Sequence, residues 1–362
     1  MQDLMEKAKE LGIDKISVTH AQPFHDEYKN GLDLQLQGLY PKFVETDLNL
    51  RTNPAAILSS VRSIISVAIA YKSTAPSLEP LSGQLSRYAW GEDYHNILYL
   101  RLESLVTWLR KAYGIVDYYI AVDSKPPIDR AIALRAGLGW IGQNCSVFVP
   151  PYGSWVFLGE ILVDQELPSI SSPVQKPSCV ADCGRCVKAC PTNALYEPYK
   201  INPHICISYL TQMKGMVPRY LRPKLGTKLW GCDICQQVCP HNQKAPASNN
   251  DCFYPIEKTS IPLIPLLTIS KKSFQQRFGH TALAWRGRGL LQRNAALILG
   301  NIGDPQAING LSDALKDPKP VVRASAIWAL TKINTSRSQE LVAKAVDYET
   351  DPLVLAEVES SS

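Results

Sequence analysis

Along the first 165 residues, segments with a strand-like pattern of apolar residues are interspersed with segments that have a helical pattern. Short runs of β-branched and apolar residues favour strands over 15–18, 63–71, 116–122 and 155–163. Apolar residues at every third or fourth position predict helices over 2–11, 94–113 and 128–136. Because strands and helices follow one another in turn, this part of the chain is expected to form an α/β domain.

The rest of the chain has a different pattern. Residues 167–178 are rich in Pro and Ser without periodicity, and a second Pro-bearing stretch covers 261–265, so both are expected boundaries. Residues 293–300 recur at 323–330, an offset of 30 that is typical of HEAT-like helical repeats. The expected organisation is an α/β domain at 1–167, a cysteine-rich domain at 168–260 and an all-α HEAT-like repeat at 261–362.

Composition places the protein among ordinary folded proteins. The chain has 362 residues, of which 45% are hydrophobic and 20% charged, which excludes a disordered or fibrous chain. No apolar run approaches the roughly 20 residues that span a bilayer, and the first residues lack the layout of a secretory signal. We therefore expect a cytoplasmic protein with no membrane partner.

Charge is concentrated near the C-terminus. Residues 271–337 hold 11 Lys and Arg against 3 Asp and Glu, a local charge of +8, whereas 338–362 carry −5. A basic segment of this kind is suited to a polyanion such as nucleic acid. The alternative is a solvated helical surface without a partner.

Cysteine spacing carries the clearest chemical signal. Eight of the ten cysteines fall between Cys179 and Cys239, and the pattern C-x2-C-x3-C-P occurs twice, ending at Cys190 and at Cys239. That ending is typical of ferredoxins with two [4Fe–4S] clusters, in which the last cysteine of each run binds the other cluster. We expect a ferredoxin-like domain with two clusters.

Crossed ligation divides the cysteines into two sets. One cluster takes Cys179, Cys183, Cys186 and Cys239, and the other takes Cys190, Cys206, Cys232 and Cys235. Two structural zinc sites are the alternative, since four-cysteine zinc sites also use C-x2-C. Cys145 and Cys252 are interpreted as plain buried thiols.

Several strings taken together resemble one family over nearly the whole chain. They are RYAWGEDYH at 87–95, YIAVDS at 119–124, RAGLGWIGQN at 135–144, CISYLT at 206–211, WGCDICQ at 230–236, WRG at 285–287 and QRN at 292–294. The combination resembles the epoxyqueuosine reductases. The resemblance implies a cobalamin-dependent enzyme with two [4Fe–4S] clusters that reduces the epoxide of epoxyqueuosine at the tRNA wobble position to the alkene of queuosine.

Asp123 is the candidate proton donor. It follows a predicted strand, where sites of α/β domains collect, and it matches the catalytic aspartate of the family. The alternative is that Asp123 caps the turn before two prolines. Asp129 is the rival carboxylate, although it reads as a residue of a first helical turn. His95 is interpreted as a structural hydrogen-bonding residue.

The resemblance also implies binding residues. The expected cobalamin contacts are Arg51, Ser86, Asp123, Val147, Leu158, Ser208, Cys232 and Asp233. Gln212 and Lys214 resemble residues of the tRNA approach, and charge alone adds Arg286, Arg288, Arg293, Lys319 and Arg323 as phosphate contacts. An unidentified electron donor and a monomeric chain complete the expectation.

Two other functions are compatible with parts of this pattern. A reductive dehalogenase-like enzyme also pairs cobalamin with two clusters, but many of those carry a twin-arginine signal that this chain lacks. A noncatalytic ferredoxin carrier would not need a domain of 165 residues or a carboxylate in a pocket.

Overall fold

Two compact units make up the chain. The computed structural model describes residues 2–75, 77–123, 125–169, 179, 182–256 and 260–360. Unit 1 comprises 1–74, 93–204 and 234–254, and unit 2 comprises 75–92, 205–233 and 255–362. The cysteine-rich stretch is therefore shared between the two units. The three-domain boundaries drawn from the sequence do not follow these units and stay a prediction.

A four-stranded sheet forms the centre of unit 1. Its strands are β1 (Lys15–His20), β2 (Ser63–Ala70), β7 (Val156–Val163) and β4 (Tyr118–Val122), in that spatial order. Every neighbouring pair is antiparallel, so the unit is α+β, and the expected α/β class is corrected. β2 and β4 do run in the same direction, but β7 inserts between them antiparallel to both. The alternation of elements could not show which later strand fills that place.

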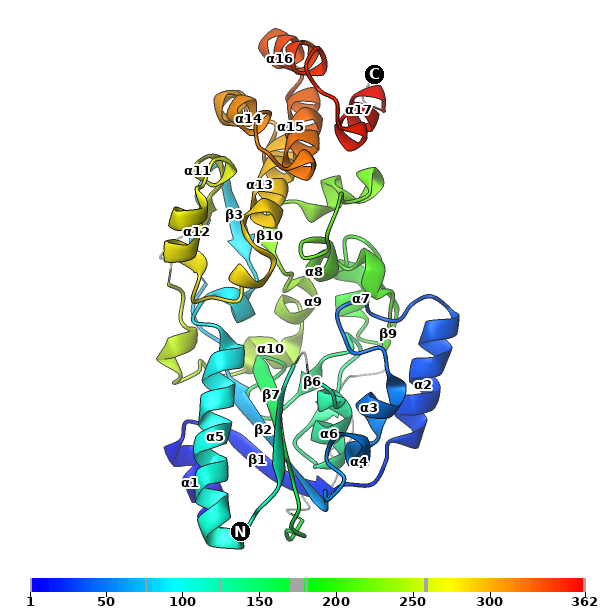
Figure 1. Ribbon diagram of the computed structural model, residues 1–362, viewed down its shortest axis with the longest axis vertical. Coiled ribbons are helices and arrows are strands. Elements are labelled where there is room, and N and C mark those ends of the chain that lie inside the picture. Colours follow the sequence, from blue (N-terminus) through cyan, green and yellow to red (C-terminus); the bar gives the residue numbers. More distant parts are fainter. Residues whose placement is uncertain are drawn as a thin grey trace. The chain divides into compact units, whose positions relative to one another are not determined.

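Helices cover both faces of this sheet. Figure 1 shows α1 (Gln2–Glu10) and α5 (Tyr94–Tyr113) to one side, and α6 (Asp129–Arg135) to the other. α5 begins where the Asp93 side chain accepts the His95 backbone N–H, and it ends at Gly114 in the left-handed conformation. All eight residues of β2 are buried, which explains its nearly continuous apolar run.

Shorter elements complete unit 1. They are α2 (His25–Leu36), α3 (Leu48–Thr52), α4 (Pro54–Ile57), β5 (Trp140–Ile141), β6 (Val147–Phe148), α7 (Arg185–Ala189), β8 (Leu195–Glu197), β9 (Lys200–Ile201), α9 (Ile234–Gln237) and α10 (Pro240–Lys244). Strands β5 and β6 pair antiparallel, as do β8 and β9.

Unit 2 contains a small sheet of its own. β3 (Ser82–Leu85) lies between β10 (Lys228–Trp230), which is parallel to it, and β11 (Ile261–Pro262), which is antiparallel. The single-turn helix α8 (Ile207–Leu210) belongs to the same unit. The sheet therefore joins three segments that are far apart in the sequence.

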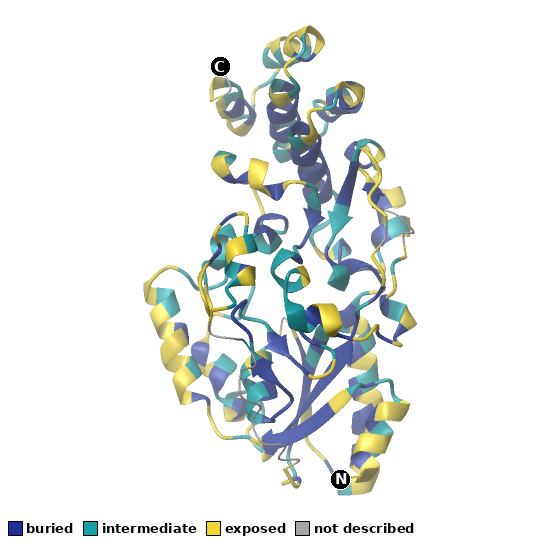
Figure 2. Cartoon of the chain, turned by 180° about the vertical axis from the view of Figure 1, so that it is seen from behind, coloured by how far each residue is buried: buried dark blue, intermediate teal, exposed yellow. Residues whose placement is uncertain are grey.

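The C-terminal part of unit 2 is helical. Its helices are α11 (Leu263–Leu267), α12 (Lys271–Phe278), α13 (Arg288–Ile302), α14 (Ile308–Ala314), α15 (Pro320–Ile333), α16 (Ser336–Val346) and α17 (Pro352–Glu359). The two copies of the 30-residue repeat fall on α13 and α15, which pack together and are buried along most of their length (Figure 2). A β-carbon at Gly300 of α13 would lie 2.8 Å from the Ala329 Cα, so glycine permits this close crossing.

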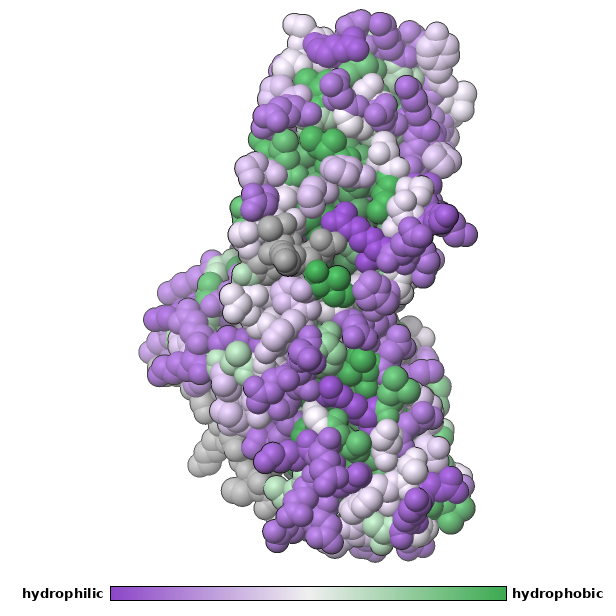
Figure 3. Space-filling view, turned by 90° about the vertical axis from the view of Figure 1, so that its left-hand side faces the viewer, coloured by the Kyte–Doolittle hydropathy of each residue, from purple (hydrophilic) through white to green (hydrophobic). Residues whose placement is uncertain are grey.

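Hydrophilic side chains cover most of the face seen in Figure 3, with smaller apolar areas among them. None of the helices in the described part of the chain combines the length and apolar character that crossing a membrane requires.

Candidate active site and thiol clusters

Asp123 lies directly after the last residue of β4, as the sequence predicts. Its backbone adopts a positive φ of 47°, a conformation that Asp tolerates better than most residues. The side chain is 55% exposed. A strand held in the sheet thus presents an accessible carboxylate at its end.

Tyr94 and His95, at the start of α5, both bond to this carboxylate. The Tyr94 hydroxyl donates to Asp123 Oδ2 at 2.6 Å, and His95 Nε2 lies 3.2 Å from the same oxygen. His95 Nδ1 lies 2.7 Å from Asp93 Oδ1. The Tyr94 ring stacks on Phe157 of β7 with centroids 4.2 Å apart, so the helix start is fixed against the sheet.

Electrostatic interactions determine whether the proton lies on Asp123 or on His95. Burial opposes the charged form of His95, but the hydrogen bonds and charges of Asp123 and Asp93 outweigh it and raise its pKa to about 9. Partial desolvation by the surrounding protein acts to raise the pKa of Asp123 even though its side chain is 55% exposed, but hydrogen bonds from His95 and Tyr94 and the charges of His95 and Arg51 lower it. At neutral pH the pair is therefore an Asp123 carboxylate beside a protonated His95.

The sequence interpretation of His95 as a hydrogen-bonding residue agrees with these contacts, but it did not identify Asp123 as the partner. The available signal was the run Asp93-Tyr94-His95 at a predicted helix start, which places three polar side chains within one turn. What the sequence could not show is that this turn faces the end of β4.

Two further carboxyl groups lie near Asp123. Burial raises the pKa of Asp129 at the start of α6, and the charge of Asp123 adds to this effect. Glu160 of β7 is 1% exposed, and burial followed by the charges of Asp129 and Asp123 raises its pKa well above the usual value. Glu160 Oε1 has no hydrogen-bond partner among the residues that the structure describes. In both groups the pKa shift favours the neutral carboxyl over the charged form, relative to an exposed carboxyl group.

Unit 1 brings four thiols into electrostatic range of one another. Burial raises the pKa of Cys179, and the charges of Cys239 and Cys183 raise it further. Burial likewise raises the pKa of Cys186, with contributions from Cys179 and Cys239. Three thiols of one run thus gather with the last thiol of the other run. Four thiolates are the ligands that an iron–sulfur cube needs.

The other four cysteines of the pattern are divided between the units. Cys190 follows α7 and Cys235 lies in α9, both in unit 1, whereas Cys206 precedes α8 and Cys232 follows β10 in unit 2. Across the described residues, no three His, Cys, Asp or Glu side chains are arranged to hold a single metal ion. An iron–sulfur cube needs a different arrangement of ligands, because each thiolate binds a separate iron.

The two cysteines outside the pattern are half-buried rather than buried. The Cys145 carbonyl accepts from Arg130, and the Cys252 sulfur lies 3.7 Å from an Arg101 nitrogen. Their interpretation as plain thiols stays a prediction.

The predicted cobalamin contacts fall into two sets. In unit 1, Val147 and Leu158 belong to one apolar cluster, and Arg51 is close enough to act on the pKa of Asp123. In unit 2, the Ser86 hydroxyl donates to Asp233 Oδ1, and the Arg87 backbone N–H donates to Oδ2 at 2.8 Å.

The members of the second set, in unit 2, are mostly polar. Ser86 and Asp233 are buried, and burial raises the pKa of Asp233 although the bond from Ser86 opposes this. Contact of either set with cobalamin stays a prediction. Cys232 directly precedes Asp233, and Ser208 lies in α8.

The predicted tRNA approach is a short loop after α8. Gln212 Nε2 donates to the Ser208 carbonyl at 2.9 Å, which orders its side chain. Lys214 is exposed at the tip. Both positions are compatible with a surface contact, and their roles stay predictions.

Arg293 does not fit the predicted phosphate contact, and this expectation is corrected. The side chain is 0% exposed, and its guanidinium donates to the carbonyls of Leu210, Met213 and Gly215. A buried guanidinium whose donors are all used cannot reach a phosphate. The charge count could not distinguish a buried arginine from an exposed one.

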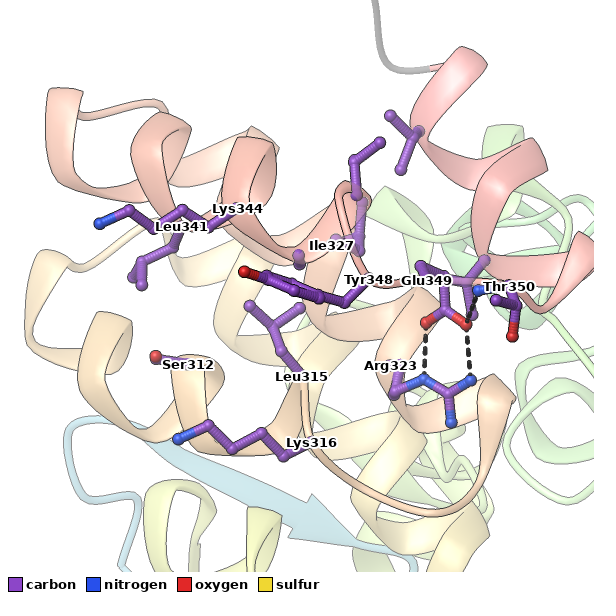
Figure 4. A pocket seen from close by; sticks show the side chains of 14 residues that line it. Ser312, Leu315, Lys316, Arg323, Ile327, Leu341, Lys344, Tyr348, Glu349 and Thr350 are labelled. Carbon is purple, nitrogen blue, oxygen red and sulfur yellow. Dashed lines mark hydrogen bonds and ion pairs between the residues drawn. The ribbon is translucent and has the colours of Figure 1, made fainter.

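Two other predicted basic contacts are engaged in ion pairs. Arg288 lies 3.3 Å from Asp317, and Arg323 forms a two-point pair with Glu349 at 2.7 and 2.8 Å. Figure 4 shows this pair beside a cavity of about 460 Å³. Lys319 is exposed, and Arg286 stacks on the exposed Trp285.

Fold and site together define an iron–sulfur protein with HEAT repeats and a candidate proton-transfer site. The family model for the 4Fe-4S double cluster binding domain matches residues 178–242, and that for HEAT repeats matches 286–361. The model described as "Epoxyqueuosine reductase QueG, DUF1730" matches residues 51–124. Together with the relatives described next, these matches show that the chain belongs to the epoxyqueuosine reductase family.

Relatives resemble the chain over almost its whole length. The epoxyqueuosine reductase of Bacillus anthracis is 39% identical over 366 residues, which cover 99% of this chain and 95% of that protein. The Bacillus subtilis enzyme is 37% identical, with 99% and 94% covered. A solved epoxyqueuosine reductase with an epoxyqueuosine-modified tRNA-Tyr stem loop superposes with a TM-score of 0.94 at 36% identity, covering 99% of this chain and 97% of that one.

Proposed function

We propose that this protein reduces the epoxide of epoxyqueuosine in tRNA to the alkene of queuosine. The observation that carries the proposal is the Asp123 carboxylate, which is accessible at a strand end and bonded to a protonated His95. Family membership and the tRNA stem loop bound to a close structural relative support the choice of substrate.

The reaction consumes two electrons and two protons, and it releases the epoxide oxygen as water. Asp123 and His95 would supply a proton to the departing oxygen, with His95 holding it at neutral pH and Asp123 facing the substrate. Tyr94 would keep the carboxylate in place through its hydroxyl. Asp123 thus acts as the donor by passing on the proton that rests on His95.

Bound cobalamin would supply the strong reductant and nucleophile for the epoxide carbon. The residues that we propose to contact it are those that the family resemblance implies: Arg51, Ser86, Asp123, Val147, Leu158, Ser208, Cys232 and Asp233. Two [4Fe–4S] clusters would deliver electrons one at a time from an external donor, held by the two crossed cysteine sets.

Gln212, Lys214 and Lys319 are the proposed tRNA contacts that the structure leaves on or near the surface. Arg286 and the ion-paired Arg288 and Arg323 complete this set. Phosphate contacts of this kind position RNA without reading its sequence. A monomer acting in the cytoplasm is the proposed working form.

The decisive experiment is anaerobic incubation with epoxyqueuosine-containing tRNA, cobalamin and a strong reductant. Digestion and nucleoside mass analysis should show a loss of one oxygen as queuosine forms. Omission of cobalamin is the control and should leave epoxyqueuosine intact. Complete absence of queuosine with a fully loaded wild-type enzyme would refute the proposed function.

A further inference from the structure

Arg293 is an unusual buried cation. All five of its guanidinium hydrogen bonds go to oxygen atoms: one each to the carbonyls of Leu210, Met213 and Gly215, at 2.6–2.7 Å, and two to Asn294 Oδ1. The residue is 0% exposed, and burial together with the charge of Arg222 lowers its pKa to about 9. Burying such a charge costs free energy, which the hydrogen bonds between the guanidinium and the loop offset.

Asn294 joins two segments of unit 2. Its Nδ2 donates to the carbonyl of Thr211 at 2.8 Å and to the carbonyl of Leu229 at 2.9 Å. The Thr211 hydroxyl in turn accepts the backbone N–H of Gly231 at 2.9 Å. Three hydrogen bonds therefore fix the stretch around residue 211 against the stretch 229–231.

Each of these stretches carries a cysteine of the second predicted set. Cys206 directly precedes α8, and the Leu210 N–H bonds back to the Cys206 carbonyl at 2.9 Å. Cys232 directly follows Gly231. Arg293 binds the end of α8, and Asn294 binds both stretches, so the two residues hold the backbone segments on which Cys206 and Cys232 lie.

We propose that Arg293 and Asn294 are positioning residues for the second iron–sulfur cluster. They hold the Cys206 and Cys232 segments in one arrangement before the cluster is inserted, and Arg293 adds a buried positive charge at the end of α8. The proposal rests on the assignment of Cys206 and Cys232 as ligands of one cluster, which belongs to the proposed function.

The charge has a consequence of its own. Reduction adds an electron to a cluster that already carries four thiolates, so a buried cation nearby favours the reduced form. Little solvent screens this charge, because Arg293 is fully buried. Replacing Arg293 by a neutral residue should lower the reduction potential of the second cluster and leave that of the first unchanged.

The test compares Arg293→Met with Arg222→Met in the full-length, anaerobically reconstituted protein. Arg222 is the control, since it is also buried in unit 2 but binds the Val217 carbonyl and has its charge paired with Glu357. Iron content and the two midpoint potentials, followed by electron paramagnetic resonance, are the measurements. The iron content of the Arg293→Met variant should fall from about eight to about four irons per chain, or the variant should keep about eight irons and have one midpoint potential lowered. Arg222→Met should keep both clusters unchanged.

Asn294→Ala keeps the charge and decides the outcome if Arg293→Met does not fold. It should lose iron from one cluster, whereas Arg293→Lys should retain the potential better than Arg293→Met. The proposal is overturned if the Arg293 and Asn294 variants keep about eight irons and both potentials, or if Arg222→Met loses iron to the same extent. Wild-type protein with eight irons but no turnover would contradict the proposed function instead.

Discussion

At the scale of single residues, the site depends on a proton shared unequally between Asp123 and His95. His95 lies between two carboxylates, Asp93 and Asp123, and both stabilise its charged form. Asp123 in turn has its charge stabilised by His95, Tyr94 and Arg51. A carboxylate with a lowered pKa is a poor acid by itself, but it can transfer a proton that its neighbour keeps available.

Asp123→Asn should abolish most turnover while cobalamin and tRNA binding persist. The amide keeps the shape of the side chain but cannot pass on a proton, so a loss of about 10²–10⁴-fold in kcat is expected. Single-turnover rates and equilibrium binding of stem-loop RNA measure the two effects separately. Turnover within a factor of about three of wild type would remove Asp123 from the mechanism.

The pH profile should report His95. Its raised pKa means that the group is protonated at neutral pH and loses its proton as the pH passes about 9, so wild-type turnover should decline there. His95→Gln should lose this alkaline limb and have a lower rate throughout. Tyr94→Phe is the control, because it removes a bond to Asp123 but leaves the imidazole, and it should keep the limb. An unaltered profile in His95→Gln would show that another group controls it.

Glu160→Gln should stabilise the protein increasingly as the pH rises. The folded-state pKa of Glu160 lies above the unfolded value, so wild-type stability is greatest below the unfolded pKa and decreases as the pH rises toward the folded pKa. The side-chain amide of the Glu160→Gln variant does not titrate, so the variant does not lose stability in this way. Melting temperatures between pH 5 and 9 should diverge in favour of the variant, by about 2–4 °C for each kcal/mol gained. Exposed Glu103→Gln is the control and should show no divergence.

At the scale of elements, helix α13 is constrained at two points along its length. One end of its repeat segment carries Arg293 and Asn294, and the other crosses α15 at Gly300. A side chain at Gly300 would meet the Trp328 ring at 2.6 Å and the Ala329 Cα at 2.8 Å. The crossing is therefore set by backbone-to-backbone approach, which cannot relax by a rotamer change.

Gly300→Ala should destabilise the protein by about 1–3 kcal/mol despite the better helix propensity of alanine. Gly289→Ala in the same helix is the matched control. Its new methyl group would meet only the flexible end of the Lys319 side chain, so a neutral or slightly stabilising effect is expected. Chemical denaturation of both variants measures the difference. Equal stability of the two would show that α13 and α15 can separate at little cost.

At the scale of the whole molecule, the sequence predicted what depends on local pattern and missed what depends on long-range pairing. The helix over Tyr94–Tyr113 and the repeat helices α13 and α15 follow from periodicity and caps. The place of β7 between β2 and β4, and the joining of distant segments into two units, depend on contacts that no local window contains.

The same division holds for the site. The position of Asp123 and the gathering of Cys239 with the first cysteine run follow from motif and spacing, whereas the burial of Arg293 and Glu160 does not. Charge counts treat every ionisable residue as exposed, so they assign a phosphate contact to an arginine that holds a loop. Buried charges are thus the least predictable part of such a site.

Crossed ligation by the two cysteine runs can be tested with paired double variants. If Cys190 and Cys235 bind the same cluster, the double change to Ser removes that cluster and leaves the other intact, with about four irons and a normal [4Fe–4S] spectrum. Changing Cys190 and Cys239 to Ser should instead damage both clusters, because it removes one ligand from each. The closeness of Cys239 to Cys179 and Cys186 supports this pairing. If each run held its own cluster, the Cys190 and Cys235 variant would instead lose one ligand from each cluster, and the Cys190 and Cys239 variant would damage both clusters under either arrangement. Intact spectra at about four irons in the first variant alone therefore distinguish crossed from local ligation.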